Sequence, residues 1–259
     1  MDFLTVQNLS YSYEGSFPAL SEINFTIKKG SCVCVAGANG SGKSTLLQLL
    51  AGCMKPSRGD ILIDGLSIFR DEKIRRKTGI VFQEPDNQLF MPTVWEDVAF
   101  AVLQKGTNPQ DVRKMAEDAL ELVEAKHLAD RPPYKLSGGE KQRAAIASIL
   151  ISFQSNIEDK ILLIDEPTAS LDPRARKNCI ALLKKLTCTR IIASHDLDMA
   201  LDLCDETLFL QNGRIAESSP APGLLLDETF LQSIGLELPL RRAAALPLSY
   251  HLQGAILNR

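Results

Sequence analysis

A glycine-rich segment at residues 37–45, GANGSGKST, follows a short apolar run and precedes a leucine-rich one. This order of strand, loop and helix is the context that the phosphate-binding pattern G-x-x-x-x-G-K-[ST] requires. Glycines let backbone N–H groups surround phosphate oxygens, and the helix N-terminus adds its positive end. The alternative is a glycine-rich turn before a helix that merely carries a lysine, which the strand-loop-helix order disfavours. We therefore expect a nucleoside triphosphate here, contacted by Gly37, Asn39, Gly40, Ser41, Gly42, Lys43, Ser44 and Thr45.

Two adjacent carboxylates, Asp165 and Glu166, end the apolar run at 161–164. Asp165 would provide an anionic partner for a Mg²⁺ ion that the Ser44 hydroxyl helps to coordinate. Glu166 is a candidate to orient or deprotonate an attacking water. Acidic residues often end strands, so this pair alone is a weak indication. Together with the phosphate loop, it indicates metal-assisted hydrolysis of the triphosphate.

A second glycine turn, LSGGEKQR at residues 136–143, precedes another helical run. Ser137 is suited to cap the helix, and Glu140 three residues later completes the spacing of a capping box. Free N–H groups, a hydroxyl and the positive helix end together make an anion site. The segment is therefore either simply a well-capped helix or a second phosphate-binding surface.

These motifs need a sheet that brings strand ends together. The apolar runs at 160–165 and 189–194, joined by a helical run that starts at Pro173, are typical of a buried parallel sheet. The N-terminal stretch is β-rich, residues 92–152 are helical in pattern, and Asn212 and Gly213 mark a hairpin. We expect an α/β fold with a mostly parallel core sheet.

The overall composition sets limits on the class of protein. With 259 residues, 45% hydrophobic and 24% charged, the chain can bury a substantial core. A net charge of −3 disfavours a nucleic-acid surface. We see neither a secretory signal nor a run of about 18 apolar residues, so we expect no membrane span. The close pair Cys32 and Cys34 should be core residues in a reducing compartment.

The complete set of motifs resembles the nucleotide-binding domain of ATP-binding-cassette (ABC) proteins over roughly residues 3–217. The resemblance implies a P-loop NTPase with an N-terminal antiparallel β subdomain, and a helical signature subdomain inserted at about 84–155. It also implies a C-terminal extension at 218–259. In this family the serine-glycine-glycine turn of one subunit closes over the ATP held by another, so a head-to-tail dimer with two ATP molecules is expected. The motifs that carry the resemblance are Tyr13, residues 37–45, Gln83, 136–143, 161–166, 170–172 and His195.

The resemblance also implies roles for single residues. Tyr13 would stack on the adenine, with Tyr11 as the competing choice. Gln83 would reach the Mg²⁺ ion and the attacking water, since an amide can accept and coordinate without fixing a charge. His195 would contact the γ-phosphate and fix the water. Four residues would act between subunits: Ser137, Gly138 and Gly139 in trans, and Asp172 as a link between the two sites.

The run EPDNQLFMPTVWEDVAF at residues 84–100 is similar to that of energy-coupling-factor (ECF) importers for transition-metal ions and vitamins. That branch implies a membrane-embedded coupling protein docked near 84–100, a separate membrane protein that captures the substrate, and a position on the cytoplasmic face of a bacterial or archaeal membrane. The second ATPase would be another copy or a different chain, with the C-terminal extension contributing to their pairing. The apolar members of the run have core packing as their alternative: Leu89, Phe90, Val94 and Trp95.

The sequence departs from the family pattern at two places. Ser137 and Asp165 lie 28 positions apart, more than is usual, and Ser148 replaces an arginine or glycine. The competing function is a soluble ABC ATPase that acts as a scaffold or clamp, as in iron–sulfur assembly, and the run at 84–100 favours the importer. A P-loop kinase would explain neither the LSGG turn nor His195.

Overall fold

The larger of two sheets positions the phosphate loop. In the computed structural model, which describes residues 2–14, 18–153 and 156–243, this sheet has six strands in the order β10-β9-β3-β8-β7-β6. All run parallel except β10, which pairs antiparallel with β9 across the predicted hairpin. The strands are β3 (Cys32–Ala36), β6 (Thr78–Val81), β7 (Ile161–Asp165), β8 (Thr189–Ser194), β9 (Glu206–Gln211) and β10 (Arg214–Pro220). The expected parallel core is confirmed.

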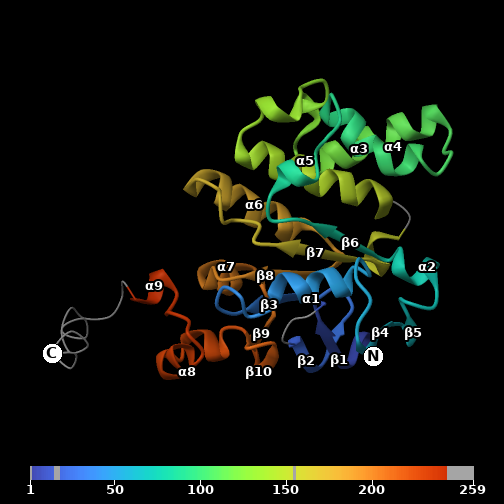
Figure 1. The fold of residues 1–259 in the computed structure, drawn as a ribbon. Helices are drawn as coiled ribbons and strands as arrows, with labels where there is room; N and C mark the ends of the chain where they lie inside the picture. The colour runs from blue at the N-terminus through green and yellow to red at the C-terminus, as the bar shows by residue number, and fades with distance from the viewer. Residues whose placement is uncertain (1, 15–17, 154–155, 244–259) are drawn as a thin grey trace.

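The smaller sheet is antiparallel, in the order β2-β1-β4-β5, and forms the expected N-terminal β subdomain. Helix α1 (Lys43–Leu50) lies between the two sheets (Figure 1), where its leucines join one core cluster with residues of β1 and β3. The strands are β1 (Asp2–Ser12), β2 (Pro18–Lys28), β4 (Arg58–Ile63) and β5 (Leu66–Ser67), and helix α2 (Glu72–Arg75) follows them.

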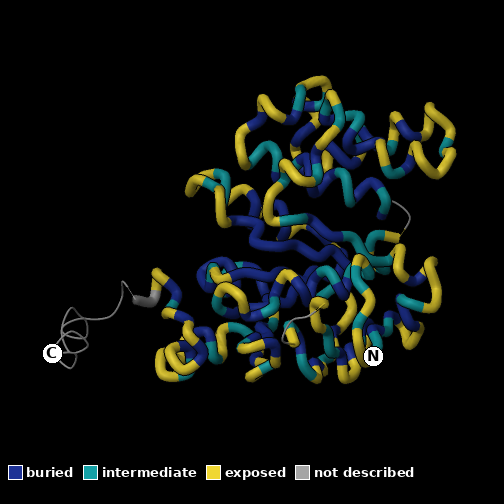
Figure 2. The backbone as a smooth tube through the Cα atoms, in the orientation of Figure 1, coloured by how far each residue is buried: buried dark blue, intermediate teal, exposed yellow. Residues whose placement is uncertain are grey.

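Strand β3 separates two cores because its side chains alternate. Cys32 and Cys34 join the cluster formed with the helical subdomain and the C-terminal helices, whereas Val33 and Val35 face α1 and the smaller sheet. Both thiols are buried and unbridged, as expected for core residues. Figure 2 shows the buried residues concentrated along the strands and on the helix faces that cover them.

A group of helices at the top of Figure 1 follows β6 and precedes β7. Asn108 caps one of them by accepting from the backbone N–H of Gln110, as its position before Pro109 predicts. Its helices are α3 (Val94–Leu103), α4 (Pro109–Leu122) and α5 (Gly138–Leu150), with short 3₁₀ turns at Pro85–Asn87 (η1), Lys126–Leu128 (η2), Pro133–Lys135 (η3), Ile151–Phe153 (η4) and Ile157–Asp159 (η5). The turns η4 and η5 lie in the segment between α5 and β7, within the unusually long spacing between Ser137 and Asp165. Residues 154–155, between these two turns, are outside the described chain.

Helices α6 (Pro173–Lys185) and α7 (Leu197–Leu203) cover the larger sheet near β7 and β8. The chain beyond the hairpin returns to the larger sheet, where Phe230 packs edge-on against Phe209 with ring centroids 4.9 Å apart. Strand β10 runs past residue 217, where the extension was expected to begin, and η6 (Gly223–Leu226), α8 (Glu228–Ser233) and α9 (Leu240–Ala243) follow. The tail after residue 243 lies outside the described residues. No helix in the described parts of the chain has the length and apolarity needed to cross a membrane.

Candidate nucleotide-binding and hydrolysis site

The predicted chemistry gathers at one edge of the larger sheet. Strands β3, β8 and β7 are parallel neighbours, with Ala36 opposite Ser194 and Asp165 opposite Ala193. The carboxyl ends of parallel strands meet at the same edge, which is where open α/β sheets bind ligands. The phosphate loop, the two acidic residues and His195 therefore lie together because each directly ends or follows one of these strands.

The phosphate loop is closed around the Lys43 amine. Lys43 is only 7% exposed, and its Nζ donates to the carbonyl oxygens of Gly37 at 2.8 Å and Ala38 at 3.2 Å. A Cβ at Gly37 would lie 2.3 Å from the Leu210 carbonyl oxygen, and Gly42 has a φ of 107°. Both positions thus require glycine. The loop residues Asn39, Gly40 and Ser41 line the cavities beside it.

Asp165 and Ser44 provide oxygen donors beside the loop. The Ser44 side chain hydrogen-bonds the Asp165 carboxylate, while Asp165 Oδ1 is buried and has no partner among the described residues. Burial raises the pKa of Asp165, and the bond with Ser44 opposes that rise. One hydroxyl and one carboxylate with an unpartnered oxygen fit Mg²⁺, which typically takes one or two carboxylates together with waters and phosphate oxygens.

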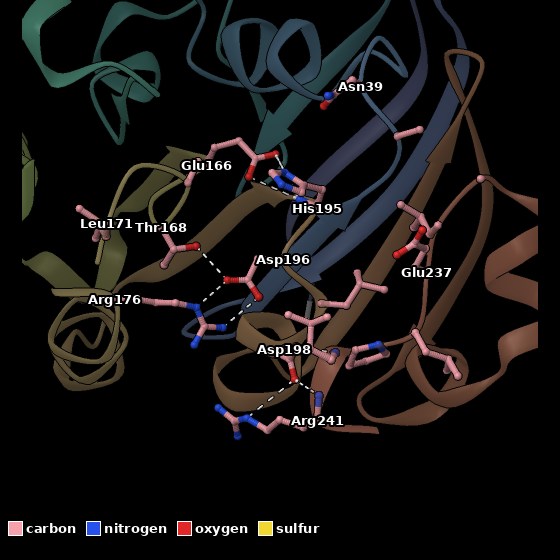
Figure 3. A pocket seen from close by; sticks show the side chains of 18 of the residues that line it. Asn39, Glu166, Thr168, Leu171, Arg176, His195, Asp196, Asp198, Glu237 and Arg241 are labelled. Carbon is pink, nitrogen blue, oxygen red and sulfur yellow. Dashed lines mark hydrogen bonds and ion pairs between the residues drawn. The ribbon is translucent and has the colours of Figure 1, made fainter. Parts of the chain in front are cut away.

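Glu166 is held by three donors that fix its carboxylate. His195 Nδ1 lies 2.8 Å from Oε1 and the His195 backbone N–H lies 3.2 Å from it (Figure 3). The Ser194 hydroxyl donates to Oε2 at 2.9 Å. Glu166 has a φ of 45°, which is uncommon for a non-glycine residue, and it is 7% exposed. Its Oε1 lies 3.9 Å from Lys43 Nζ. The carboxylate is therefore pre-oriented toward the loop.

A cavity of about 820 Å³ opens beside these groups. Asn39, Glu166 and His195 line one side of it, and the C-terminal segment 235–241 lines another. Asp198 holds this segment by accepting the backbone N–H of Leu240 at 2.7 Å, and Asp202 binds the Arg241 guanidinium at 2.6 Å and 2.8 Å. The C-terminal extension thus contributes to the wall of the candidate site.

Behind His195, a polar cluster that sequence reasoning missed anchors the next residue, Asp196 (Figure 3). Arg176 donates to both Asp196 oxygens at 2.8 Å and 2.9 Å, and the Thr168 hydroxyl and the Met199 N–H also donate to it. Burial alone would raise the pKa of Asp196, but Arg176 and these donors lower it overall. Sequence gave one clue, because an aspartate directly before a helix is a common cap.

The second glycine turn is built as the capping box that its spacing predicts. The Glu140 backbone N–H donates to Ser137 Oγ at 3.4 Å, and the Ser137 N–H and hydroxyl both donate to Glu140 Oε2 at 2.8 Å. These bonds lower the pKa of Glu140. Ser137 and Gly138 are exposed. Asp172 caps α6 by accepting from the N–H groups of Arg174 and Ala175.

The remaining predicted residues lie at the margins of the site. The Tyr13 hydroxyl lies 3.1 Å from Thr45 Oγ1, and its half-exposed ring packs edge-on against Tyr11 at 5.0 Å. Gln83 is exposed but lines a cavity of about 190 Å³ together with Gly138 and Glu166. The structure thus brings Gln83 and Glu166 to one small cavity.

Comparisons with known proteins identify the family. The ABC transporter family model matches residues 20–169. A protein of Geobacter sulfurreducens named as an ABC transporter ATP-binding protein is 46% identical over 237 residues, covering 91% of this chain and 93% of the relative. The energy-coupling factor transporter ATP-binding protein EcfA3 of Clostridium perfringens is 38% identical over 244 residues, covering 91% of this chain and 84% of the relative.

Two solved structures share the fold over most of the chain. One is cbiO1 from Clostridium perfringens, described as part of the ABC transporter complex cbiONQ, with a TM-score of 0.78 and 37% identity over 94% of this chain and 99% of that one. The other is a dimeric post-hydrolysis state of the ATP-binding cassette MJ0796 bound to ADP and Pi, with a TM-score of 0.74 and 31% identity over 85% of this chain and 99% of that one.

Proposed function

The chain belongs to the ABC transporter family as one of its ATPases, and we propose that it drives an ECF-type importer as a head-to-tail ATPase dimer. The substrate would be a transition-metal ion or a vitamin captured by a separate membrane protein. Relatives named as an ECF transporter ATPase and as cbiO1 of a cbiONQ complex support this branch. In this proposal the subunit sits on the cytoplasmic face of the membrane.

Within one site, we assign the steps of hydrolysis to residues at the sheet edge. Lys43 and the N–H groups of residues 37–45 bind the phosphates, and Tyr13 stacks on the base. Ser44, Asp165 and Gln83 would hold Mg²⁺, which neutralises charge on the phosphates when bound. Glu166 accepts the proton of the attacking water, and His195 fixes the water and the γ-phosphate. The three donors on Glu166 support this role because they orient its carboxylate before substrate arrives.

The exposed serine-glycine-glycine turn is the main observation that supports the proposed head-to-tail dimer. Ser137 and Gly138 are exposed at the N-terminus of α5. A helix N-terminus attracts anions, and this one has no phosphate-binding loop of its own chain beside it among the described residues. A Cβ at Gly138 would meet only the Ser170 carbonyl oxygen at 3.5 Å and Leu171 at 3.7 Å, so the glycine is not needed for folding. We propose that it leaves room for the phosphate held by a second subunit, with Asp172 linking the two sites.

An exposed aromatic pair supports docking of the membrane coupling protein. Phe90 is 65% exposed and Phe100 is 36% exposed, and their rings meet edge-on at 5.1 Å. Their neighbours Leu89 and Val94 are buried in the core, and Trp95 packs partly against it. Asp97 fixes the exposed loop by accepting the N–H groups of Phe90 and Met91. Two large apolar side chains held outward beside the Gln83 loop suit an interface with an apolar partner.

Mixing two inactive variants tests the head-to-tail arrangement. Lys43→Ala breaks the phosphate loop, and Gly138→Asp places a carboxylate in the opposing turn. A mixed dimer then contains one site with both halves intact, so about a quarter of wild-type ATPase activity should return after random pairing of equal amounts. Activity of the Gly138→Asp variant alone, or no activity in the mixture, would contradict the arrangement.

A further inference from the structure

Gln88 lies in the run at residues 84–100, yet none of the roles assigned above uses it. Its Oε1 accepts the backbone N–H of Phe82 at 3.3 Å, and its Nε2 donates to the Ala145 carbonyl at 2.9 Å and to Ser148 Oγ at 2.9 Å. One amide therefore connects the end of β6, directly before Gln83, to the middle of α5. Since α5 begins at the Ser137 cap, Gln88 links the segment that carries Gln83 to the helix whose N-terminus would face the ATP of the second subunit.

Ser148, the departure noted in the sequence, serves as a partner in this link. Its hydroxyl accepts from Gln88 and donates to the Ala145 carbonyl at 2.9 Å. An arginine at this position could not accept a hydrogen bond, and a glycine has no side chain to offer one. The unusual serine is therefore explained by the glutamine that faces it.

A second contact joins the same loop to α5 two turns closer to its N-terminus. Lys141 Nζ binds both carboxylate oxygens of Asp86, at 2.6 Å and 2.9 Å. Asp86 and Lys141 also line the cavity of about 190 Å³ that Gln83, Gln142 and Glu166 share. Gln142 Nε2 is buried and has no partner among the described residues. The loop that follows Gln83 is thus attached to α5 at two places, and one of them borders this cavity.

We propose that Gln88 is a positioning residue for hydrolysis, which fixes the backbone carrying Gln83 to α5 so that Gln83 and the serine-glycine-glycine turn move as one unit. The inference rests on the role proposed above for Gln83. Its chemistry requires an amide, because the side chain must accept one bond and donate two. Glutamate would place an oxygen against the Ala145 carbonyl, and leucine would leave the Phe82 N–H and that carbonyl without their partner.

Steady-state kinetics of the full chain test the inference. Gln88→Leu should lower kcat about tenfold and leave the KM for ATP within about twofold, because the loss acts on a hydrolytic group and not on nucleotide binding. Ser148→Ala removes one of the three bonds and should lower kcat about two- to threefold. Gln110→Leu makes the same chemical change on an exposed face of the helical group and should leave kcat unchanged. Wild-type kcat in Gln88→Leu would overturn the inference.

The double variant separates positioning from a general loss of stability. If Gln88 acts through Gln83, adding Gln88→Leu to Gln83→Ala should lower kcat no further. If Gln88→Leu lowers kcat by the same factor in the wild type and in Gln83→Ala, the inference is overturned and the role of Gln83 remains intact. A Gln83→Ala chain with wild-type kcat would instead overturn the proposed role of Gln83 itself. Should Gln88→Leu fail to fold, Ser148→Ala in the same two backgrounds gives the same test with a milder change.

Discussion

The candidate functional residues at the edge of the larger sheet and those in the helical group differ in how far they are buried and bound by their own chain. At the sheet edge, Lys43 and Glu166 are nearly buried and already bound by neighbouring groups of the same chain. In the helical group, Gly138 and Phe90 face outward, and their neighbours only hold them in place. The first arrangement is organised within one chain, whereas the second faces solvent. In the roles proposed above, chemistry and control therefore occupy different parts of this cassette.

The largest expected effect lies at the organised edge. Glu166→Gln keeps the size and hydrogen-bonding reach of the side chain but removes the base, so kcat should fall by a factor of about 10² or more. ATP binding, measured by equilibrium titration, should remain because Lys43 and the loop are unchanged. Glu121→Gln is the matched control on an exposed helix face. Persistent hydrolysis in the Glu166 variant would mean that the base lies elsewhere.

The helical group should show the converse behaviour. Phe90→Ser removes an exposed ring, so the free energy of unfolding should change by no more than about 0.5 kcal/mol and basal hydrolysis should persist. Stimulation by the reconstituted membrane complex should fall about tenfold, since a central aromatic anchor of an interface contributes more than about 1 kcal/mol.

Leu66→Ser, at an exposed apolar residue of the smaller sheet, is the control for Phe90→Ser and should retain stimulation. If both variants couple to the membrane complex as well as the wild type does, the docking surface lies outside the aromatic pair.

The same two regions differ in how far sequence could predict them. The phosphate loop and the acidic pair could be predicted from neighbouring residues alone, because a strand, a glycine turn and a helix follow one another directly in the chain. The fold class and the capping box at Ser137 were confirmed for the same reason. The assigned roles of Gln83, Tyr13 and the trans residues stay predictions.

Sequence could not predict contacts between distant segments. Asp196 meets Arg176, 20 positions away in α6, and Thr168, 28 positions away in the segment before α6. Ser148 departs from the family pattern, and its hydrogen-bond partner Gln88 lies 60 positions away in the chain. The run at residues 84–100 was also ambiguous, because Leu89 is buried while Phe90 is exposed. Neighbouring apolar residues in a turn have no periodicity that distinguishes buried from exposed positions.

The smallest expected effect concerns the support behind the organised edge. Asp196→Asn should destabilise the protein by about 1 kcal/mol, because Arg176 would keep its partly buried charge without a full counter-charge. The folded-state pKa of Asp196 is lowered from its usual 3.8. Its carboxylate therefore contributes stability above that value, and the contribution is lost as the pH falls through and below it. The difference between wild type and variant should be fully present near neutral pH and shrink as the pH falls below 3.8.

Urea unfolding of both proteins from pH 7 to the lowest pH at which they remain folded measures this difference. Glu72→Gln breaks the exposed pair with Arg76 and serves as the control, because exposed ion pairs contribute about 0–1 kcal/mol. A difference between wild type and Asp196→Asn that stays constant with pH would mean that the carboxylate acts through shape and not through charge. Because Asp196 directly follows His195, the charge-dependent outcome would also predict a lower kcat in Asp196→Asn at pH 7, with His195 no longer held firmly against Glu166.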